Sequence, residues 1–266
     1  MFLYICQDLK SKIMLKKAIL FILIVLGCSN SSQAQYEQFY KEFGIMAGPV
    51  FLKSDFGARG DFENFAKNSG FTVGGFYYMT FVENFPNIRE KFKFRLEASY
   101  TSLNMRHYGK YVDNESNSLF TRQLRAMEGK TTIGTFGVQV EFFPWRVDDY
   151  NRGGSPFTPY IAGGVQVNSY SSEITSSLGK IGTPETTPAK YMSGAKTDQG
   201  VAGSLSASIG TRIKIADYHA LIVEMRGQYY LSDWVDGLNP NNKVYKENKS
   251  NDWSTAITVG YVYYFN

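Results

Sequence analysis

The stretch from Ser254 to Asn266 constrains the fold more than any other part of the sequence. In it Ile257, Val259, Tyr261 and Tyr263 alternate with a second set of residues, and this period of two predicts a β-strand. The strand is long, because ordinary strands have about 5 to 6 residues, whereas a tilted strand that crosses a membrane needs about 9 to 11. A cluster of aromatic residues ends it. These signals predict the closing strand of a membrane β-barrel.

Seven further segments show the same alternation over about 10 to 15 residues. The clearest is Phe92–Arg106, in which Phe94 and Leu96 alternate with Lys93, Arg95 and Glu97. The other six are Glu42–Phe51, Phe71–Phe81, Thr131–Phe143, Phe157–Tyr170, Val201–Ile215 and Ala220–Tyr230. With the last strand they predict an all-β fold: an eight-stranded antiparallel up-and-down transmembrane β-barrel with long outer loops.

A soluble sandwich or lipocalin-like barrel has the same alternation with its apolar face turned inward. Short and long connections alternate here, as they do in outer-membrane barrels, where the long loops lie outside the cell. Aromatic residues form 16% of the chain and gather at both ends of the strands, as interfacial girdles would. The expected girdle residues are Phe81, Phe142, Phe143, Trp145, Phe157, Tyr160, Tyr218, Tyr263 and Phe265 at the short turns, and Tyr100, Tyr108, Tyr170, Tyr229, Tyr230, Trp234 and Trp253 at the long loops.

The N-terminus is typical of a secretion signal. Two lysines precede an apolar run, and a small-x-small site ends at Ala34. We therefore expect a signal peptide at residues 1–34, with Met14 as the true start, and a barrel domain at residues 35–266 exported to the outer membrane. The alternatives are a membrane anchor helix, for which the apolar run is short, and a lipoprotein acylated on Cys28.

Charge and cysteine content exclude several classes of function. The predicted signal carries four lysines and one aspartate, so its removal lowers the formal net charge from +4 to about +1. This leaves no basic patch for a nucleic-acid partner. Both cysteines, Cys6 and Cys28, lie in the same segment, so the mature chain would have no disulfide and no thiolate metal site.

A set of charged residues falls on the predicted inward face of the barrel. An eight-stranded barrel is just wide enough for side chains to fill it. Because unpaired buried charges are costly, we expect these residues to form a plug of paired charges rather than a conduit or a proton path. The set is Arg95, Glu97, Glu141, Arg212, Lys214, Glu224 and Arg226.

The sequence offers little for catalysis. It contains no dinucleotide-binding, P-loop, nucleophile-elbow or zinc-protease motif. Its two histidines are His107, where a strand meets an outer loop, and His219, in the shortest turn. Rim histidines are more often ordinary polar residues than catalytic bases, so we expect no enzyme and no cofactor or metal, and we keep a rim-sited envelope enzyme as an alternative.

The outer loops are the better place for function. Asp and Asn residues in the last loop could bind calcium, and its two tryptophans could stack on a sugar; ordinary turns and a girdle explain the same residues. The short segment Leu119–Gly129 has helical character and carries two arginines. The candidate loop interaction surface is Arg122, Arg125, Asp233, Trp234, Asp236, Asn239, Asp252 and Trp253.

Several motifs resemble an uncharacterised family of small exported outer-membrane β-barrel proteins. They are the run Phe43–Val50 followed by Ser54–Gly57, the run Gln123–Met127, the triplet Phe143–Trp145, and the late runs SDWVDGLNP and KENKSNDW. More weakly, the Asp-Gly-x-Asn-Pro loop is similar to the PorG-like barrel components of the type IX secretion system. The resemblance implies no catalytic residues.

We therefore expect a non-enzymatic outer-membrane barrel that acts as a structural or interaction component of the cell envelope. Its expected partners are outer-membrane lipid and other envelope or secretion proteins. A role as a secretion accessory rests on analogy alone. A ligand-binding barrel that uses the last loop remains an alternative.

Overall fold

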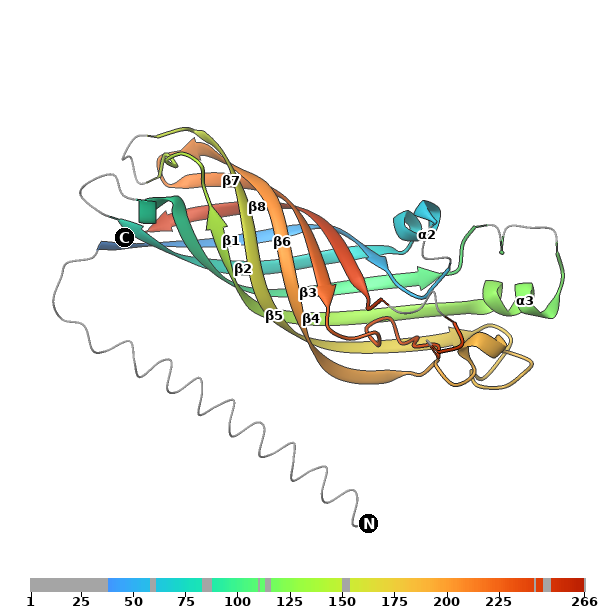
Figure 1. Cartoon of the computed structure of the whole chain (residues 1–266). Helices are drawn as coiled ribbons and strands as arrows, with labels where there is room; N and C mark the ends of the chain where they lie inside the picture. The colour runs from blue at the N-terminus through green and yellow to red at the C-terminus, as the bar shows by residue number, and fades with distance from the viewer. Residues whose placement is uncertain are drawn as a thin grey trace, which may run out of the picture. The chain divides into compact units, whose positions relative to one another are not determined.

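The computed structural model describes residues 38–57, 61–82, 88–109, 111–112, 116–149, 154–241, 243–245 and 250–265, without the side chains of 38–40, 81 and 82. The predicted signal peptide, its expected cleavage site, Cys28 and the expected start at Met14 lie outside these residues, as does the side chain of Phe81. Figure 1 shows the elements in chain order. They are β1 (Gln38–Lys53), α2 (Phe62–Lys67), β2 (Ser69–Val82), η2 (Ile88–Lys91), β3 (Phe92–Arg106), α3 (Leu119–Ala126), β4 (Met127–Phe142), β5 (Phe157–Ser176), η3 (Ala189–Tyr191), β6 (Asp198–Ala216), β7 (His219–Tyr230) and β8 (Trp253–Phe265).

The eight strands form one closed barrel in chain order. Each strand is antiparallel to its neighbour, and β8 closes the barrel by pairing with β1, with Ala47 opposite Val259. The prediction of an eight-stranded antiparallel barrel closed by the last segment is therefore confirmed. We call the end with the long connections the outer end, at the right in Figure 1, and the end near the C-terminus the inner end.

The strand bounds agree closely with the predicted ones at the inner end and run longer at the outer end. Strand β3 matches the prediction, whereas β5 continues to Ser176 rather than Tyr170. In the extensions of β4 and β5 Lys130 pairs with Glu173, and Glu128 of β4 pairs with Arg106 at the end of β3. These outward residues are exposed and polar, so the apolar alternation that marks the rest of the strands ends before the strands do.

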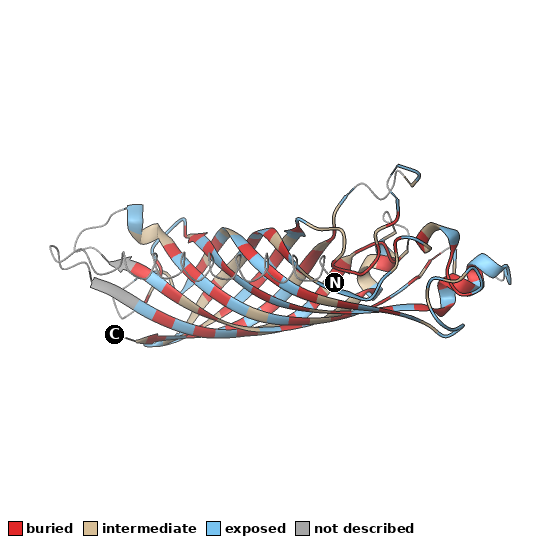
Figure 2. Ribbon diagram, turned by 90° about the horizontal axis from the view of Figure 1, so that it is seen from below, coloured by how far each residue is buried: buried red, intermediate tan, exposed pale blue. Residues whose placement is uncertain are grey.

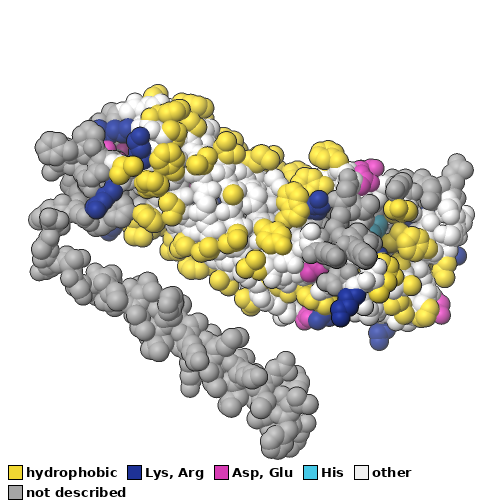
Figure 3. Space-filling view, in the orientation of Figure 1, with side chains coloured by type: hydrophobic (Ala, Val, Ile, Leu, Met, Phe, Trp, Pro, Cys, Tyr) yellow, Lys and Arg dark blue, Asp and Glu magenta, His cyan; other side chains and the backbone are white. Residues whose placement is uncertain are grey.

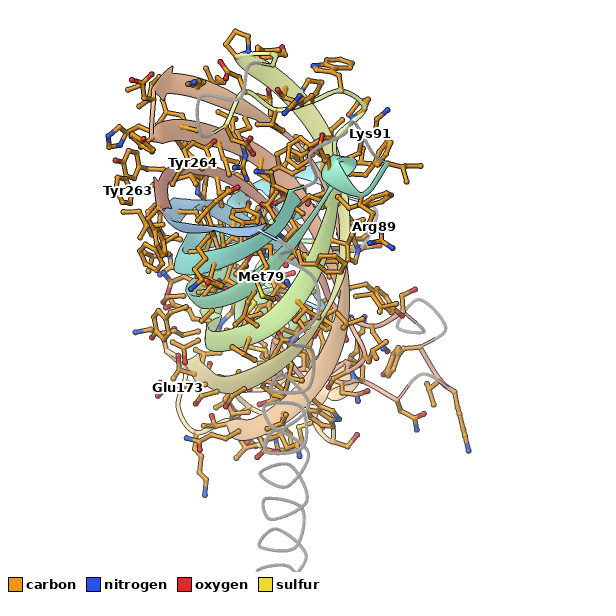
Figure 4. All side chains as sticks on the ribbon, turned by 90° about the vertical axis from the view of Figure 1, so that its left-hand side faces the viewer. Met79, Arg89, Lys91, Glu173, Tyr263 and Tyr264 are labelled. Carbon is orange, nitrogen blue, oxygen red and sulfur yellow. The ribbon has the colours of Figure 1, made fainter. Side chains whose placement is uncertain are left out.

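The two faces of the barrel differ as predicted. Along β3, burial alternates with each residue: Phe94 and Leu96 are 41% and 39% exposed, whereas Arg95 is 1% exposed. Figure 2 shows this as bands of buried and exposed residues along every strand, and Figure 3 shows hydrophobic side chains over the barrel wall. Tyr263 and Tyr264, labelled in Figure 4, lie outside and inside the wall of β8.

The aromatic girdles are only partly as predicted. Phe143, Tyr160, Tyr170 and Tyr230 are buried inside the barrel instead of facing outward. The inward position of Tyr160 follows from the alternation along the strand, because its neighbour Ile161 is on the exposed face. Aromatic character alone did not reveal which face each residue takes.

Two short helices lie at the outer end. The predicted helical segment is present as α3, although the helix ends at Ala126 and the last three predicted residues belong to β4. Its N-cap Ser118 accepts a hydrogen bond from the backbone N–H of Thr121. Helix α2 was not predicted, and its N-cap Asp61 accepts from the N–H of Glu63. No helix within the described ranges has the length and hydrophobicity needed to cross a bilayer.

The barrel interior has an apolar cluster at each end. The inner cluster contains Phe76, Phe143 and Tyr264, and the outer one contains Leu52, Leu103 and Met127. Charged and polar side chains fill the interior alongside the inner cluster and between the two clusters.

Candidate functional site

Arg95, from β3, is the centre of a buried network of charges. Its guanidinium donates to Glu141 at 2.9 Å and to both carboxylate oxygens of Glu224, at 2.9 and 3.1 Å. It also donates to the side-chain oxygen of Gln139 at 2.9 Å. Because Glu141 and Glu224 come from β4 and β7, one arginine joins opposite parts of the barrel wall.

A second arginine extends the network toward the outer end. Arg226 donates to Glu224 at 2.6 Å and binds both carboxylate oxygens of Glu97, one of them at 2.8 Å. The hydroxyl of Tyr160 donates to Glu224 at 2.6 Å. Glu224 therefore accepts hydrogen bonds from three side chains, which compensates for its burial.

A further group of charges surrounds Glu42, near the inner end. Lys93 and Arg212 both form ion pairs with Glu42, and Lys93 also binds Asp149 at 2.8 Å. The guanidinium of Arg212 lies 4.7 Å from the ring centre of Tyr78, a cation–π contact. Lys214 is less buried and pairs with Asp148 at 3.1 Å, at the inner lip of the barrel.

We call this set of buried charges and their hydroxyl partners the lumen network. All eight strands contribute to it, in order through Glu42, Tyr78, Arg95, Glu141, Tyr160, Arg212, Glu224 and Tyr264. Its charged members are Lys93, Arg95, Arg212 and Arg226 against Glu42, Glu97, Glu141, Asp149 and Glu224. The two signs nearly balance, as expected for charges that cannot be left unpaired in a buried site.

Six of the seven residues predicted to form a plug are in the lumen network, and Lys214 lies at its edge. Glu42 and Lys93 were not predicted to belong to the plug, although both have the inward parity of their strands. Asp149 carried no such signal because it lies in a connection between strands, and folding brings it to Lys93.

The lumen network leaves little free space. A cavity of about 20 Å³ lies on its outer side, lined by Met46, Thr101, Arg226, Gln228 and Tyr230 among others. That volume is close to the space of a single water molecule. Among the residues that the structure describes, the interior is therefore filled rather than channelled.

Loop residues close the outer end of the barrel. Phe56, Leu124, Tyr191, Val235 and Leu238 come from four different connections or the helices within them and pack in one apolar cluster with the ends of the strands. We call this cluster and the loops that form it the outer cap. The loops are thus part of the folded core rather than free segments.

Two carboxylates of the candidate loop surface are buried inside the outer cap. Asp236 accepts hydrogen bonds from the backbone N–H groups of Leu238 and Asp55, both at 2.7 Å. Asp252 accepts from the N–H groups of Val235 and Asp236, at 3.1 and 3.3 Å. Both side chains are fully buried, so the expectation that they lie at an interaction surface is wrong. They shape the turn, which is why its sequence carries acidic residues.

The surroundings of these two carboxyls disfavour negative charge. Burial raises the pKa of Asp236 well above its usual range, and the nearby Asp55 adds to this. Burial likewise raises the pKa of Asp252 well above its usual range, with Asp236 and then Asp55 as further causes. Within the described part of the chain, no three His, Cys, Asp or Glu residues are arranged to hold a metal ion.

The other candidate surface residues lie apart from one another. Arg122 and Arg125 are exposed on α3, and Arg125 donates to the backbone oxygen of Val112 at 2.7 Å. Trp234 is half-buried in the outer cap, with Lys196 lying 4.3 Å from its ring centre. Asp233 and Asn239 are also half-buried. Trp253 lies on the outer wall, where it stacks on Phe65 at 5.5 Å. They do not form one surface.

The two histidines have packing roles. His107 is buried in the outer cap, accepts the N–H of Gly57 at Nδ1 at 2.8 Å, and packs against Phe56 and Tyr191. Burial lowers the pKa of His107 to about 3, and the nearby Lys190 adds to this. It is therefore neutral at physiological pH. His219 packs against Tyr261 and Tyr263 on the outer wall.

Several solved structures are similar to this chain. Ail, the attachment invasion locus protein of Yersinia pestis, is 12% identical, with 86% of this chain and 99% of that chain covered and a TM-score of 0.42. Neisserial surface protein A is 11% identical, with 85% and 97% covered and a TM-score of 0.42. A major outer membrane protein from Thermus thermophilus is 15% identical, with 85% and 99% covered and a TM-score of 0.47. Likenesses at this level carry no argument about function.

The sequence matches no curated protein. One family model, described as a domain of unknown function (DUF6089), matches residues 16–266. Its description gives no partner and no secretion system, so the resemblance to PorG-like components stays a prediction. This match covers nearly the whole chain, and the chain therefore belongs to the DUF6089 family.

Proposed function

We propose that this chain is an outer-membrane β-barrel with a filled lumen, which acts as a structural or interaction component of the cell envelope through its outer end. The apolar outer wall supports the membrane location. Ile45, Val138, Ile161, Ile209 and Val259, on five different strands, are all more than half exposed. A wall of this kind would be a large aggregation-prone patch in water, whereas in a bilayer it is the expected lipid face.

The closed sheet supports the same location. Every backbone group within hydrocarbon needs a partner, and a closed barrel provides one because it has no sheet edge. The polar extension beyond the apolar wall at the outer end, with Arg106, Glu128, Lys130 and Glu173 exposed, suits strands that continue into water above the membrane.

The lumen network is the observation that carries the rest of the proposal. Ion pairs cross the interior, and tyrosine hydroxyls from the remaining strands complete the network. This arrangement gives a porin role no support. Function then lies on surfaces outside the lumen. The tip of α3 is one such surface: Leu119 and Phe120 are 53% and 47% exposed, next to Arg122 and Arg125. An exposed apolar pair beside arginines is typical of protein interfaces.

Four measurements test this proposal. The protein should fractionate with outer membranes, migrate faster on a gel without heating, and show no conductance in planar bilayers. A photo-crosslinker at Phe120 should capture an envelope protein, and one at Val244, an exposed apolar residue of the last loop, should not. Steady conductance, or no difference between the two positions, would contradict the proposal.

A secretion accessory is a narrower version of the same role. Its support is the Asp236–Pro240 loop, which is similar to PorG-like components. Stable co-purification of secretion components from native membranes would favour it, and loss of that recovery in a Phe120→Ser variant would link it to α3. If no secretion component co-purifies from native membranes, the secretion-accessory role is contradicted.

The other two alternatives have less support. A calcium or glycan site in the last loop would use Asp236 and Trp234, but Asp236 already accepts two backbone hydrogen bonds inside the outer cap. A rim enzyme would use His107, which is buried and neutral. Calcium binding abolished by Asp236→Ala, or an activity lost on His107→Ala, would revive the respective alternative.

A further inference from the structure

Helix α2 is attached to the barrel through polar side chains. Asn64 bonds both backbone groups of Tyr108, accepting from its N–H at 2.8 Å and donating to its oxygen at 2.9 Å. Asn68, one turn later, accepts from the N–H of Arg106 at 2.8 Å and donates to the oxygen of Phe56 at 3.3 Å. Both asparagines are buried. These bonds fix the helix at the outer end, beside β1 and β2 (Figure 1).

The apolar residues of α2 face away from this attachment. Phe62 is 78% exposed, the highest value among the described large hydrophobic residues. Phe65, three positions later and so on the same side of the helix, stacks on Trp253 at 5.5 Å and lies 5.9 Å from Phe51. A helix on a water-soluble protein buries its apolar side and exposes its polar side. Helix α2 departs from this pattern, because the polar Asn64 is buried while Phe62 is exposed and Phe65 is only half-buried.

The height of this aromatic group on the barrel matches a membrane boundary. Trp253 and Tyr263 lie ten residues apart on the outward face of β8, which for a tilted strand corresponds to an apolar band about 25 Å tall. Trp253 pairs with Lys53 on one side and Tyr229 on the other. The Lys53 ammonium lies 5.4 Å from the Trp253 ring centre. Aromatic residues beside a lysine are typical of the interface, where long cationic side chains reach toward headgroups.

We propose that α2 is an in-plane anchor, whose Phe62 and Phe65 enter the boundary between headgroups and acyl chains in the outer leaflet. The lipid surface is the occupant that continuity favours, because Phe65 joins α2 to Trp253 and Phe51, which belong to the lipid-facing wall. Since its bonds to Arg106 and Tyr108 hold α2 in place, the anchor needs no folding on binding. The inference rests on the proposed membrane location of the barrel.

Tryptophan fluorescence in vesicles of brominated phosphatidylcholine tests the anchor. The three native tryptophans, Trp145, Trp234 and Trp253, are first replaced by phenylalanine, and single tryptophans are then introduced. Phe62→Trp probes the anchor, Val138→Trp probes the middle of the wall, and Phe120→Trp probes the tip of α3. Heat-modifiable migration checks that each variant is folded.

We expect bromine near the headgroups to quench Phe62→Trp and bromine deep in the chains to quench Val138→Trp. The fluorescence of Phe120→Trp should be quenched by aqueous iodide and not by brominated lipid. If Val138→Trp is quenched by lipid while Phe62→Trp behaves like Phe120→Trp, the anchor is wrong and the membrane location stands. Shielding of Phe62→Trp from both quenchers would overturn the anchor in favour of a protein occupant. If brominated lipid quenches neither Phe62→Trp nor Val138→Trp, the proposed function fails as well.

Discussion

The lumen network and the outer cap are both buried, yet the first is made mainly of charged and polar side chains and the second mainly of apolar ones. The lumen network consists mainly of paired charges and tyrosine hydroxyls on strands, with at least one residue from each of the eight. The outer cap is mostly apolar and draws on loops and short helices. The comparison indicates that the network ties the wall together, so that its failure should be global, whereas the cap can open locally while the barrel persists.

The largest expected effect comes from removing the central arginine of the network. Arg95→Ala leaves Glu141 and Glu224 buried with fewer cationic partners, and breaking a buried pair in this way costs about 3 to 5 kcal/mol. The free energy of unfolding, measured in urea with lipid vesicles, should fall by that amount.

Arg106→Ala is the matched control on the same strand. Arg106 pairs with Glu128 at 2.7 Å, but both side chains are more than half exposed, and such pairs contribute about 0 to 1 kcal/mol. Equal losses in the two variants would show that the network does not hold the wall together.

Truncating a buried side chain in the outer cap should lower stability by a similar amount, but the effect should be confined to the cap. Leu238 is fully buried in the cap, and Leu238→Ala should destabilise it by about 2 to 5 kcal/mol. Hydrogen exchange in the outer loops should then speed up while the strands near Arg95 stay protected. Leu178→Ala, on an exposed loop position, is the control. Loss of heat-modifiable migration in Leu238→Ala would refute the distinction between cap and wall.

A smaller effect should come from pH. Because burial raises the pKa of Asp236 and Asp252, the folded cap holds protons that the unfolded cap has released, so its stability falls as pH rises through the raised pKa. Asp55 and Asp233 are the other charged groups that act on them. We expect proteolysis of the outer loops to be faster at about pH 9 than at about pH 5.

Asp236→Asn should weaken this pH dependence, because the amide cannot ionise. Asp198→Asn, which changes an exposed carboxylate paired with Lys196, should leave it intact. A cap whose proteolysis does not change with pH would mean that the buried carboxyls stay uncharged or stay ionised throughout.

The fold was predictable because the alternation of apolar and polar residues can be read within each strand separately. Alternation identified all eight strands and both faces, and helical character identified α3. The lumen network was predictable where parity applied, as for Arg95 and Glu224. Asp149 was not, since it enters from a connection. Asp236 and Asp252 looked like surface residues because turns and buried caps use the same residue types. Helix α2 was missed because it is short and lacks the usual pattern: Asn64 is buried, whereas Phe62 is exposed.

The central claim is that the apolar side of the barrel wall faces hydrocarbon, and a pair of arginine substitutions tests it most directly. Val138 lies midway along the apolar wall and Val201 near its outer end, and both are exposed. In a bilayer, Val138→Arg should lower the free energy of unfolding by roughly 2 to 4 kcal/mol and Val201→Arg by about 0 to 1 kcal/mol. If neither substitution changes that free energy, the wall faces water and the account is contradicted.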